Sequence, residues 1–480
     1  MRKKLNLLDE SISPLKIIWY LAWPTVLEQL LLTAVQYVDT AMVGSLGTNA
    51  TAAVTINAST TWLINGICGA LGTGFSVLVG RNIGAGDHNA ARNVIRQAML
   101  AMLVFGVAIV CIVEAVAPFL PRILKADPAI HRSASTYLAI IGGGYFFNVA
   151  INLAANIIRC SGDTKTPMFA NLGANLINVV LNFFLIFETR PIMIDFAIPL
   201  INRHVSFSFT AWGAGWGVSG AAVATVASLF VSATILVISL FRRNTDMRIS
   251  IKDKFGFDAA VWKSMFRLAY PVAGERFALS GGQIVMTAIV TGLGTASLVA
   301  HQLAITAESL AYLPAFGFSA AATTLVSQSL GAQNQHLAKK LSRLCIFGGV
   351  LFMSLMGVVL YVFSEDLISI FSKDPEVISL GGRVLRIEAF AQPFFALANV
   401  VSGVLRGAGD TKWPFIIGLA GMWGVRLGLA YMLSHIFGLG LFGAWIAMVS
   451  DLVVRGLLCL LRYKKGNWSQ VWGTVHDKAA

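Results

Sequence analysis

The stretch IRCSGDTKTP (Ile158–Pro167) returns 247 residues later as LRGAGDTKWP (Leu405–Pro414). The same shift aligns LAWPTVLEQ, which starts at position 21, with LAYPVAGER, which starts at position 268. The register holds without a gap from about residue 21 to about residue 173. Since an internal repeat determines the whole fold, it is considered before any single motif. The sequence predicts a duplicated structural unit.

The register changes near the end of each unit. GAAVAT (Gly220–Thr225) matches GAWIAM (Gly443–Met448) at a shift of 223, so the first unit has 24 additional residues. We assign this insertion to the polar and aromatic stretch between Glu188 and Trp212. Each unit contains six apolar runs, and an even number makes corresponding segments cross a bilayer in the same direction. The units are therefore expected to be parallel repeats related by an axis along the membrane normal.

The composition indicates a membrane protein. Of the 480 residues, 56% are hydrophobic and 12% are charged, whereas about 25% of the residues of a soluble domain are charged. Twelve apolar runs of roughly 20 residues each are long enough to cross a hydrocarbon core of about 30 Å. We expect an all-α membrane protein with twelve transmembrane helices in two six-helix lobes. Its expected parts are a cytoplasmic lead (1–14), the first lobe (15–241), a linker (242–261), the second lobe (262–462) and a cytoplasmic tail (463–480).

The distribution of basic residues predicts the orientation. The net charge is +13, and most lysines and arginines fall in loops that alternate assignment places on one side of the membrane. The positive-inside rule puts both termini in the cytoplasm of a multi-pass plasma-membrane protein. The first apolar run is too long for a signal peptide and lacks a cleavage site. No basic patch interleaved with aromatic residues favours nucleic acid, and the five scattered cysteines predict neither disulfides nor a thiolate metal site.

The repeated GDTK motif has the composition of a cytoplasmic turn. Gly-Asp-Thr favours a turn, and the following proline suits the first turn of a helix. The basic residues around it, Arg159 and Lys165 in the first copy, are expected to face anionic headgroups. We favour this anchoring role because contact with a substrate would place these charges near the bilayer midplane.

Charged residues inside the apolar runs are candidates for function, since each costs at least about 2.5–3.5 kcal/mol at the bilayer centre. Asp451 and Arg455 have the spacing of an ion pair within one helix, and Arg426 on the preceding helix could join them. Glu28 and Glu275 occupy equivalent repeat positions. Their symmetry favours a shared architectural role, and a cavity-lining role for one copy stays open.

Several motifs together resemble the multidrug and toxic compound extrusion (MATE) family in its bacterial form. They are a proline-containing first helix ending in DTAMVGSLG, the loop GRNIGAGDHNAAR, the RCSGDTKTP turn, and the second-half counterparts GFSAAATTLVSQSLGAQN and LRGAGDTKWP. The resemblance covers nearly the whole chain. It implies two lobes in a V around a central cavity, and export of organic, often cationic, compounds in exchange for Na⁺ or H⁺. Its implied partners are small organic cations or other amphiphilic drugs and the lipid bilayer, with no cofactor beyond the coupling ion and a monomeric state.

Asp39 is the leading candidate for cation coupling. Its repeat partner is Met286, so its role is confined to the first lobe. By resemblance, Asp39 matches the first-helix aspartate that MATE proteins use for coupling, and Thr225 matches a family threonine of the same site. Asn178 and Asn182 share one face of a helix. Carboxylate, amide and hydroxyl oxygens can hold Na⁺, and a protonated aspartate would make the same pocket a proton carrier. The remaining repeat partners are all apolar, namely Val425, Leu429 and Met448.

The type of MATE protein, and with it the coupling ion, stays open from the sequence. Asn182 is similar to NorM-type members, whereas DinF-type members carry an aspartate at that position. NorM-type members also carry an acid where this chain has Phe395.

Three further acids are candidates in the second lobe. Glu275, Glu308 and Glu388 could neutralise a cationic substrate or hold a second ion. The repeat partners of Glu308 and Glu388 are Thr61 and Ile141, so these two acids have no counterpart in the first lobe.

Two other functions compete with export of organic cations. A flippase for lipid-linked oligosaccharides or peptidoglycan precursors has the same broad architecture, but such proteins usually add helices beyond twelve and several arginines that meet pyrophosphate. A membrane-embedded enzyme is disfavoured because the sequence has no H-E-x-x-H, G-x-S-x-G or P-loop lysine motif.

Overall fold

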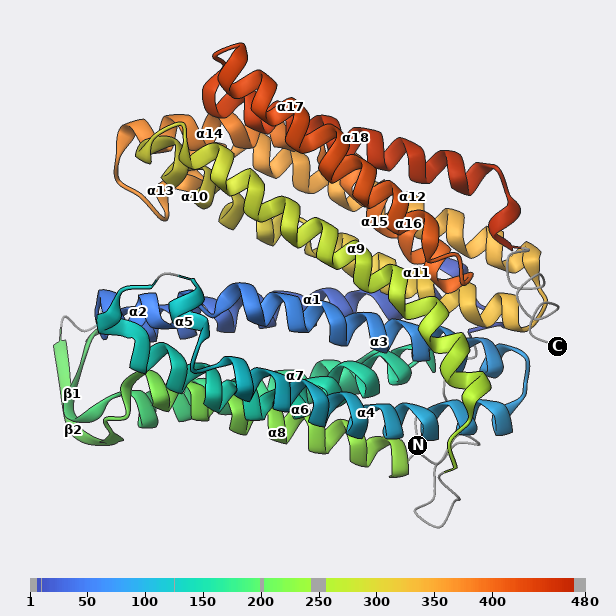
Figure 1. Ribbon diagram of the computed structural model, residues 1–480, viewed down its shortest axis with the longest axis horizontal. Helices are drawn as coiled ribbons and strands as arrows, with labels where there is room; N and C mark the ends of the chain where they lie inside the picture. Colours follow the sequence, from blue (N-terminus) through green and yellow to red (C-terminus); the bar gives the residue numbers. More distant parts are fainter. Residues whose placement is uncertain (1–6, 10, 125, 199–202, 243–255, 470–480) are drawn as a thin grey trace.

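The computed structural model describes residues 7–9, 11–124, 126–198, 203–242 and 256–469. Two helical lobes lie side by side, the first formed by α1 to α8 and the second by α9 to α18 (Figure 1). They meet at the end that carries both termini and diverge toward the opposite end, from which a β-hairpin projects. The lobes therefore form the V that the family resemblance implies.

The first lobe follows the chain through α1 (Pro14–Gly44), α2 (Thr48–Thr55), α3 (Ala58–Gly84), α4 (His88–Val116), α5 (Leu120–Ile123), the 3₁₀ turn η1 (Pro128–Ile130), α6 (His131–Cys160), α7 (Lys165–Ile186), β1 (Glu188–Ile198), β2 (Arg203–Ala214) and α8 (Gly217–Arg242). The second lobe contains α9 (Ala259–Thr291), α10 (Thr295–Ala311), α11 (Leu313–Gly331), α12 (Gln335–Val362), α13 (Ser364–Ser369), α14 (Pro375–Ala389), α15 (Gln392–Gly407), α16 (Lys412–Leu419), the π-helix η2 (Ala420–Arg426), α17 (Leu427–Tyr431), the π-helix η3 (Met432–Ile436), α18 (Gly440–Lys464) and the 3₁₀ turn η4 (Asn467–Ser469).

The helices agree with the twelve predicted membrane spans. Within the described ranges, nine helical runs are long and apolar enough to cross a membrane, and two more spans are bent pairs. The pair α10 and α11 is bent by 44°, and the pair α14 and α15 by 54°. The twelfth is α9, which has 33 residues and carries Glu275 and Arg276. These charges lower its mean hydropathy.

The insertion in the first repeat departs from an all-helical chain. It folds as an antiparallel hairpin in which Ile192 lies opposite Phe209 and Ile194 opposite Phe207. These segments are rich in isoleucine, valine, phenylalanine and threonine, which favour strands. The expectation of an all-α fold holds for the lobes and is corrected for this segment, which lies beyond the ends of the helices (Figure 1).

The repeated GDTK motif forms the predicted turn in both lobes. Gly162 and Gly409 have φ values of 87° and 85°, a left-handed conformation that glycine adopts without steric cost. The helices that follow begin at Lys165 and Lys412, so each proline of the motif lies in a first helical turn.

The lobes join through a pair of equivalent glycine contacts near the end with the termini. Gly84 of α3 packs on the backbone of Gln328 in α11, and Gly331 of α11 packs on the backbone of Arg81 in α3. A Cβ atom at either glycine would overlap the opposing backbone, so glycine permits the close approach. Gln328 also donates from Nε2 to the carbonyl oxygen of Cys160 at 2.6 Å. The repeat symmetry therefore continues through the contact between the lobes.

The first helix of each lobe also packs on the other lobe. Leu21 of α1 is fully buried in a core shared with Leu325 and Val401 of the second lobe. Met265 of α9 is fully buried in the main core of the first lobe, together with Phe75. The division of the chain into two lobes is therefore not followed strictly by the packing. The beginning of each lobe's first helix packs in a core of the other lobe.

Parts of the expected terminal and linker segments lie outside the described residues, namely 1–6 and 10 of the lead, 243–255 of the linker and 470–480 of the tail. The second lobe begins earlier than residue 262, because Asp258 caps α9. Its carboxylate accepts hydrogen bonds from the backbone N–H groups of Ala260 and Val261 at 3.0 and 3.3 Å.

Candidate functional site

The structure brings together the four residues that were assigned to cation coupling. Asp39 lies on α1, Asn178 and Asn182 lie one turn apart on α7, and Thr225 lies on α8. Asn182 Nδ2 donates to Asp39 Oδ1 at 2.6 Å and to Asn178 Oδ1 at 3.2 Å. Asn178 Nδ2 lies 3.4 Å from Thr225 Oγ1. Three helices of the first lobe thus contribute to one polar cluster.

The cluster has oxygen atoms left over for a cation. Asn182 is 1% exposed and Asn178 is 3% exposed. Among the described residues, Asn182 Oδ1 is buried without a hydrogen-bond partner. In the alternative orientation of its amide, Asn178 places its nitrogen 2.8 and 3.1 Å from the two Asp39 oxygens. Asp39 itself is partly exposed, so the cluster combines a buried amide floor with an accessible carboxylate.

The equivalent position in the second lobe is apolar. Met286, the repeat partner of Asp39, is fully buried, and Met448, the partner of Thr225, is 4% exposed. Both belong to a hydrophobic core, against which Leu429 also packs. The described residues of the second lobe therefore hold no copy of the first-lobe cluster.

Tyr137 on α6 was not identified from the sequence. It lies near enough to Asp39 to interact with its charge, and its repeat partner is Val384. The sequence did contain a signal for Tyr137, because it is a polar residue whose repeat partner is apolar. The same asymmetry singled out Asp39.

Glu28 and Glu275 form equivalent ion pairs with the arginines of the two GDTK regions. Arg159 donates to Glu28 at 2.6 Å, and Arg406 donates to both oxygens of Glu275 at 2.8 and 2.7 Å. The expectation that Arg159 faces lipid headgroups is therefore wrong, because a carboxylate inside the bundle is its partner. The basic end of Lys165 lies over the Tyr20 ring at 5.0 Å instead of extending away from the protein.

Asp451 is the centre of the predicted second-lobe ion-pair cluster. Arg426 donates to it at 2.8 Å, and Arg455 donates to both of its oxygens at 2.7 and 2.6 Å. Asp451 is fully buried, so the two guanidinium groups compensate its loss of hydration. The predicted ion pairs of Asp451 with Arg455 and Arg426 are confirmed.

Glu308 and Glu388 extend this cluster deeper into the second lobe. Glu308 on α10 is 7% exposed and Glu388 on α14 is fully buried. Their carboxyl groups lie near enough to interact with each other and with Arg426. In the described part of the chain, neither oxygen of Glu388 and neither polar atom of the Gln392 amide has a hydrogen-bond partner at bonding distance, although Glu308 lies near enough to interact with both side chains. Unpaired buried polar atoms of this kind are rare in proteins.

The helices around these acids are irregular. Glu308 lies just before the 44° bend between α10 and α11, while Glu388 and Gln392 flank the 54° bend between α14 and α15. Arg426 ends the π-helix η2. Broken spans and π-helical segments recur at the binding sites of membrane transporters and at functional sites generally. The sequence identified Glu308 and Glu388 individually, but the bends and Gln392 appear only in the structure.

The acids outnumber the cations in this region. Glu308, Glu388 and Asp451 face Arg426 and Arg455. With all five charged, the cluster carries one net negative charge, which one proton or one monovalent cation would balance.

A cluster of aromatic rings that includes Tyr312 lies beside Glu308. Tyr312, Phe316 and Phe395 pack together with ring centroids 5.3 to 6.2 Å apart. Tyr37 of α1 reaches across from the first lobe and donates to the carbonyl oxygen of Thr306 on α10 at 3.3 Å. A carboxylate beside aromatic faces is a suitable environment for an organic cation.

Comparison with known families identifies the fold and its class of activity. Residues 24–184 and 271–432 both match the MatE family profile. The chain belongs to the MatE family. The two matched segments begin 247 residues apart, as the internal repeat requires, and this MatE protein is a multi-pass membrane transporter, not an enzyme.

Relatives of this MatE protein align over most of their length. "Probable multidrug resistance protein NorM" of Thermotoga maritima is 31% identical over 458 residues, which cover 94% of this chain and 92% of the relative. "Uncharacterized transporter YisQ" of Bacillus subtilis is 24% identical, with 94% of each chain covered. The alignment with the Thermotoga maritima relative therefore covers nearly the whole of both chains.

Solved structures of the same fold cover nearly the whole chain. The structure described as "Outward-facing conformation of a multidrug resistance MATE family transporter of the MOP superfamily" superimposes with a TM-score of 0.85 at 22% identity, covering 99% of this chain and 100% of its own. A MOP superfamily transporter from Pyrococcus furiosus, described as having a reversed polarity of its binding pocket, superimposes with a TM-score of 0.85 at 23% identity, covering 97% and 99%. These similarities establish the two-lobe, twelve-helix fold.

Proposed function

We propose that this transporter exports organic cations, including drugs and toxic compounds, by antiport with Na⁺ or H⁺, and that Asp39 is the coupling group. The observation that carries the proposal is the partly exposed Asp39 carboxylate, held by Asn182 at 2.6 Å beside an unpaired buried amide oxygen. Asp39, Asn178, Asn182 and Thr225 would hold Na⁺ through oxygen atoms, the ligands that this ion prefers. A proton on Asp39 would serve in the same place.

A single ion supplies enough energy for export. Moving a compound up a tenfold gradient requires about 1.4 kcal/mol, and one charge moving down about 100 mV supplies about 2.3 kcal/mol. Coupling also requires that the ion bind one arrangement of the lobes more tightly than the other. Asp39 lies on α1, which packs on both lobes, so occupancy of its site can bias their arrangement.

In the second lobe, we assign the positive charge of the substrate to Glu308. It is buried beside Tyr312, whose ring packs with those of Phe316 and Phe395. Glu388 would share a proton or a second ion with Glu308, since its own oxygens are unpaired. Glu275 is the weakest of the three candidates, because Arg406 already satisfies both of its carboxylate oxygens.

We assign both termini to the cytoplasm of the cell that carries this protein in its plasma membrane. Basic residues concentrate at the end of the lobes where the termini lie. The lobes close at this end through Gly84 and Gly331 and diverge at the other (Figure 1). With this orientation, the arrangement opens toward the outside of the cell.

A lipid-pyrophosphate flippase is not favoured. Such a protein needs several unpaired arginines in its cavity, whereas Arg159, Arg406, Arg426 and Arg455 have carboxylate partners, which leaves Arg276 on α9 as a candidate. Paired arginines are poorly available to a pyrophosphate, which would have to displace a buried carboxylate.

Vesicle transport tests the proposal. The purified protein is reconstituted, and a Na⁺ gradient or a pH gradient is imposed separately while uptake of a fluorescent organic cation is followed. We expect one of the two gradients to drive accumulation of the dye and its collapse to abolish it. Transfer of a lipid pyrophosphate without any response of the dye to either gradient would refute the proposal.

A further inference from the structure

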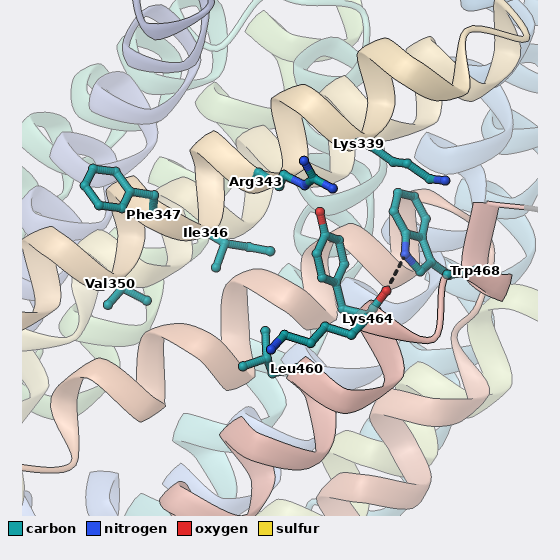
Figure 2. A pocket seen from close by; sticks show the side chains of 10 residues that line it. Lys339, Arg343, Ile346, Phe347, Val350, Leu460, Lys464 and Trp468 are labelled. Atoms are coloured by element: carbon teal, nitrogen blue, oxygen red, sulfur yellow. Dashed lines mark hydrogen bonds between the residues drawn. The ribbon is translucent and has the colours of Figure 1, made fainter.

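The groove between α12 and α18 has an unassigned combination of charge and apolar surface. It lies at the end of the second lobe that carries the termini and has a volume of about 550 Å³. Figure 2 shows Lys339 and Arg343 on α12 and Lys464 on α18 around the groove. Its length is lined by Ile346, Val350 and Leu460.

The three cations have no anionic partner within the described ranges. No ion pair there joins Lys339, Arg343 or Lys464 to a carboxylate. By contrast, Arg462, only two residues before Lys464, is paired with Asp410 at 2.7 Å. Three like charges around one groove repel each other, so an anion bound between them would be stabilised.

One wall of the groove is rigid and aromatic. Trp468 is 1% exposed, stacks on Tyr463 at a centroid distance of 5.4 Å and donates from Nε1 to the Tyr463 carbonyl oxygen at 3.0 Å (Figure 2). The Tyr463 hydroxyl lies 2.8 Å from Ser342 Oγ on α12. Tryptophan and tyrosine are enriched where a membrane protein meets the headgroup region.

Beyond the cations, the groove continues as lipid-facing apolar surface. Phe347, one turn from Arg343, is 64% exposed. A small soluble anion would leave this surface uncovered, whereas an acyl chain would cover it. The charge and the apolar length therefore favour one molecule that has an anionic head and hydrocarbon chains.

The first lobe lacks this combination at the equivalent place. Phe241 and Leu240 replace Lys464 and Tyr463 at the shift of 223, and the counterpart of Lys339 is Arg92. Arg92 already donates to Asn89 at 2.6 Å. The combination of three basic residues and an aromatic wall is thus specific to the second lobe and does not follow from the repeated fold.

We propose that this groove binds an anionic glycerophospholipid such as phosphatidylglycerol. Its phosphate lies between Lys339, Arg343 and Lys464, and its acyl chains follow Phe347 and Val350 along α12. Basic pockets between transmembrane helices bind anionic headgroups by the same electrostatic attraction. This site is separate from the transport pathway, so it stands whether or not the proposed coupling is correct.

Native mass spectrometry of the delipidated full-length protein tests the proposal, with phosphatidylglycerol and phosphatidylcholine titrated separately. We expect the anionic lipid to bind at least about tenfold more tightly, since each lysine or arginine near an anionic lipid contributes about a fivefold factor. The double variant Lys339→Gln/Arg343→Gln should lose most of this preference. The repeat-equivalent control Arg92→Gln/Arg96→Gln removes the same charge and should keep it.

Two further measurements test whether misfolding explains the loss of lipid binding and whether the groove binds a small soluble anion instead of a lipid. The charge-preserving variant Lys339→Arg/Arg343→Lys should bind like the parent. Glycerol 3-phosphate, which has the headgroup charge without acyl chains, should not compete at millimolar concentration. Equal binding of the two lipids, an unchanged preference in the double variant, or competition by glycerol 3-phosphate would each overturn the proposal.

Discussion

Asp39 and Met286 occupy the same point of the two repeats, yet one lies in a polar cluster and the other in a hydrophobic core. The first lobe places a carboxylate among amides at this point. The second lobe fills it with Met286 and Met448 and places its own buried acids, Glu308 and Glu388, on α10 and α14. The two lobes thus share the arrangement of their helices but differ in the positions of their buried polar residues.

The ion pairs that both lobes share have a different character. Glu28 pairs with Arg159 and Glu275 with Arg406, at the same separation of 131 residues. The pairs that the repeat retains in both copies join helices within a lobe, whereas Asp39, Glu308 and Glu388, which we assign to transport, occur in one copy each. The ion pairs of Asp451 also occur once, so a single copy marks a candidate for function and the contacts of each group must decide its role.

Cysteine labelling tests the parallel relation of the lobes, with an all-or-none result. Asn89 and His336 are equivalent, exposed positions at the starts of α4 and α12. In a Cys111→Ala background, Asn89→Cys and His336→Cys should both react with an impermeant maleimide from the cytoplasmic side alone. Thr210→Cys in the hairpin should react from the outside alone. Labelling of Asn89→Cys and His336→Cys from opposite sides would rule out parallel repeats.

Removal of Asp451 should give the largest loss of stability. Asp451→Ala leaves Arg426 and Arg455 buried without their carboxylate, which costs about 3–5 kcal/mol. Its repeat partner is Ser228, whose hydroxyl donates to the Thr225 carbonyl oxygen at 2.7 Å. Ser228→Ala should cost about 1 kcal/mol or less. Thermal unfolding in detergent measures both, and equal losses would contradict the assignment of Asp451 as the centre of the cluster.

The shared ion pairs should differ in strength by a smaller amount. When Arg159 is replaced, Glu28 keeps the hydrogen bond from Asn171 at 2.5 Å. Arg406 supplies both hydrogen bonds that Glu275 accepts in the described structure. Arg406→Gln should therefore destabilise the protein by about 1–2 kcal/mol more than Arg159→Gln. The same unfolding assay decides this, and a greater loss for Arg159→Gln would reverse the ranking.

Much of the architecture could be predicted because it depends on local patterns. The repeat register gave the order of the helices, and the i, i+4 spacing gave the Asp451–Arg455 pair. The equal separation of Glu28 from Arg159 and of Glu275 from Arg406 was also a usable signal, although the position of the arginines beside a cytoplasmic turn suggested that they faced anionic headgroups. The hairpin escaped prediction because an extramembrane insertion follows strand propensity and not the periodicity of the spans.

The candidate sites could be predicted only in part. Asp39 and Thr225 were identified by resemblance, and the shared face of Asn178 and Asn182 followed from helix periodicity. Convergence of Glu308, Glu388 and Gln392 depends on two helix bends and on packing between distant segments, which no local pattern encodes. Tyr137 likewise lies near enough to Asp39 to interact with its charge, although the local pattern of α6 does not show which way this residue faces.

Gradient-driven efflux by Asp39→Asn tests the central claim most directly. The variant is compared in vesicles with the parent and with Glu376→Gln, a control that neutralises an exposed carboxylate on α14. We predict that Asp39→Asn loses efflux of a cationic dye under both Na⁺ and pH gradients, while it still binds the dye within about tenfold, or 1.4 kcal/mol, of the parent. Dye binding by the variant should also stop responding to the coupling ion. Efflux at the parental rate under either gradient would contradict the account and make Asp39 a structural residue.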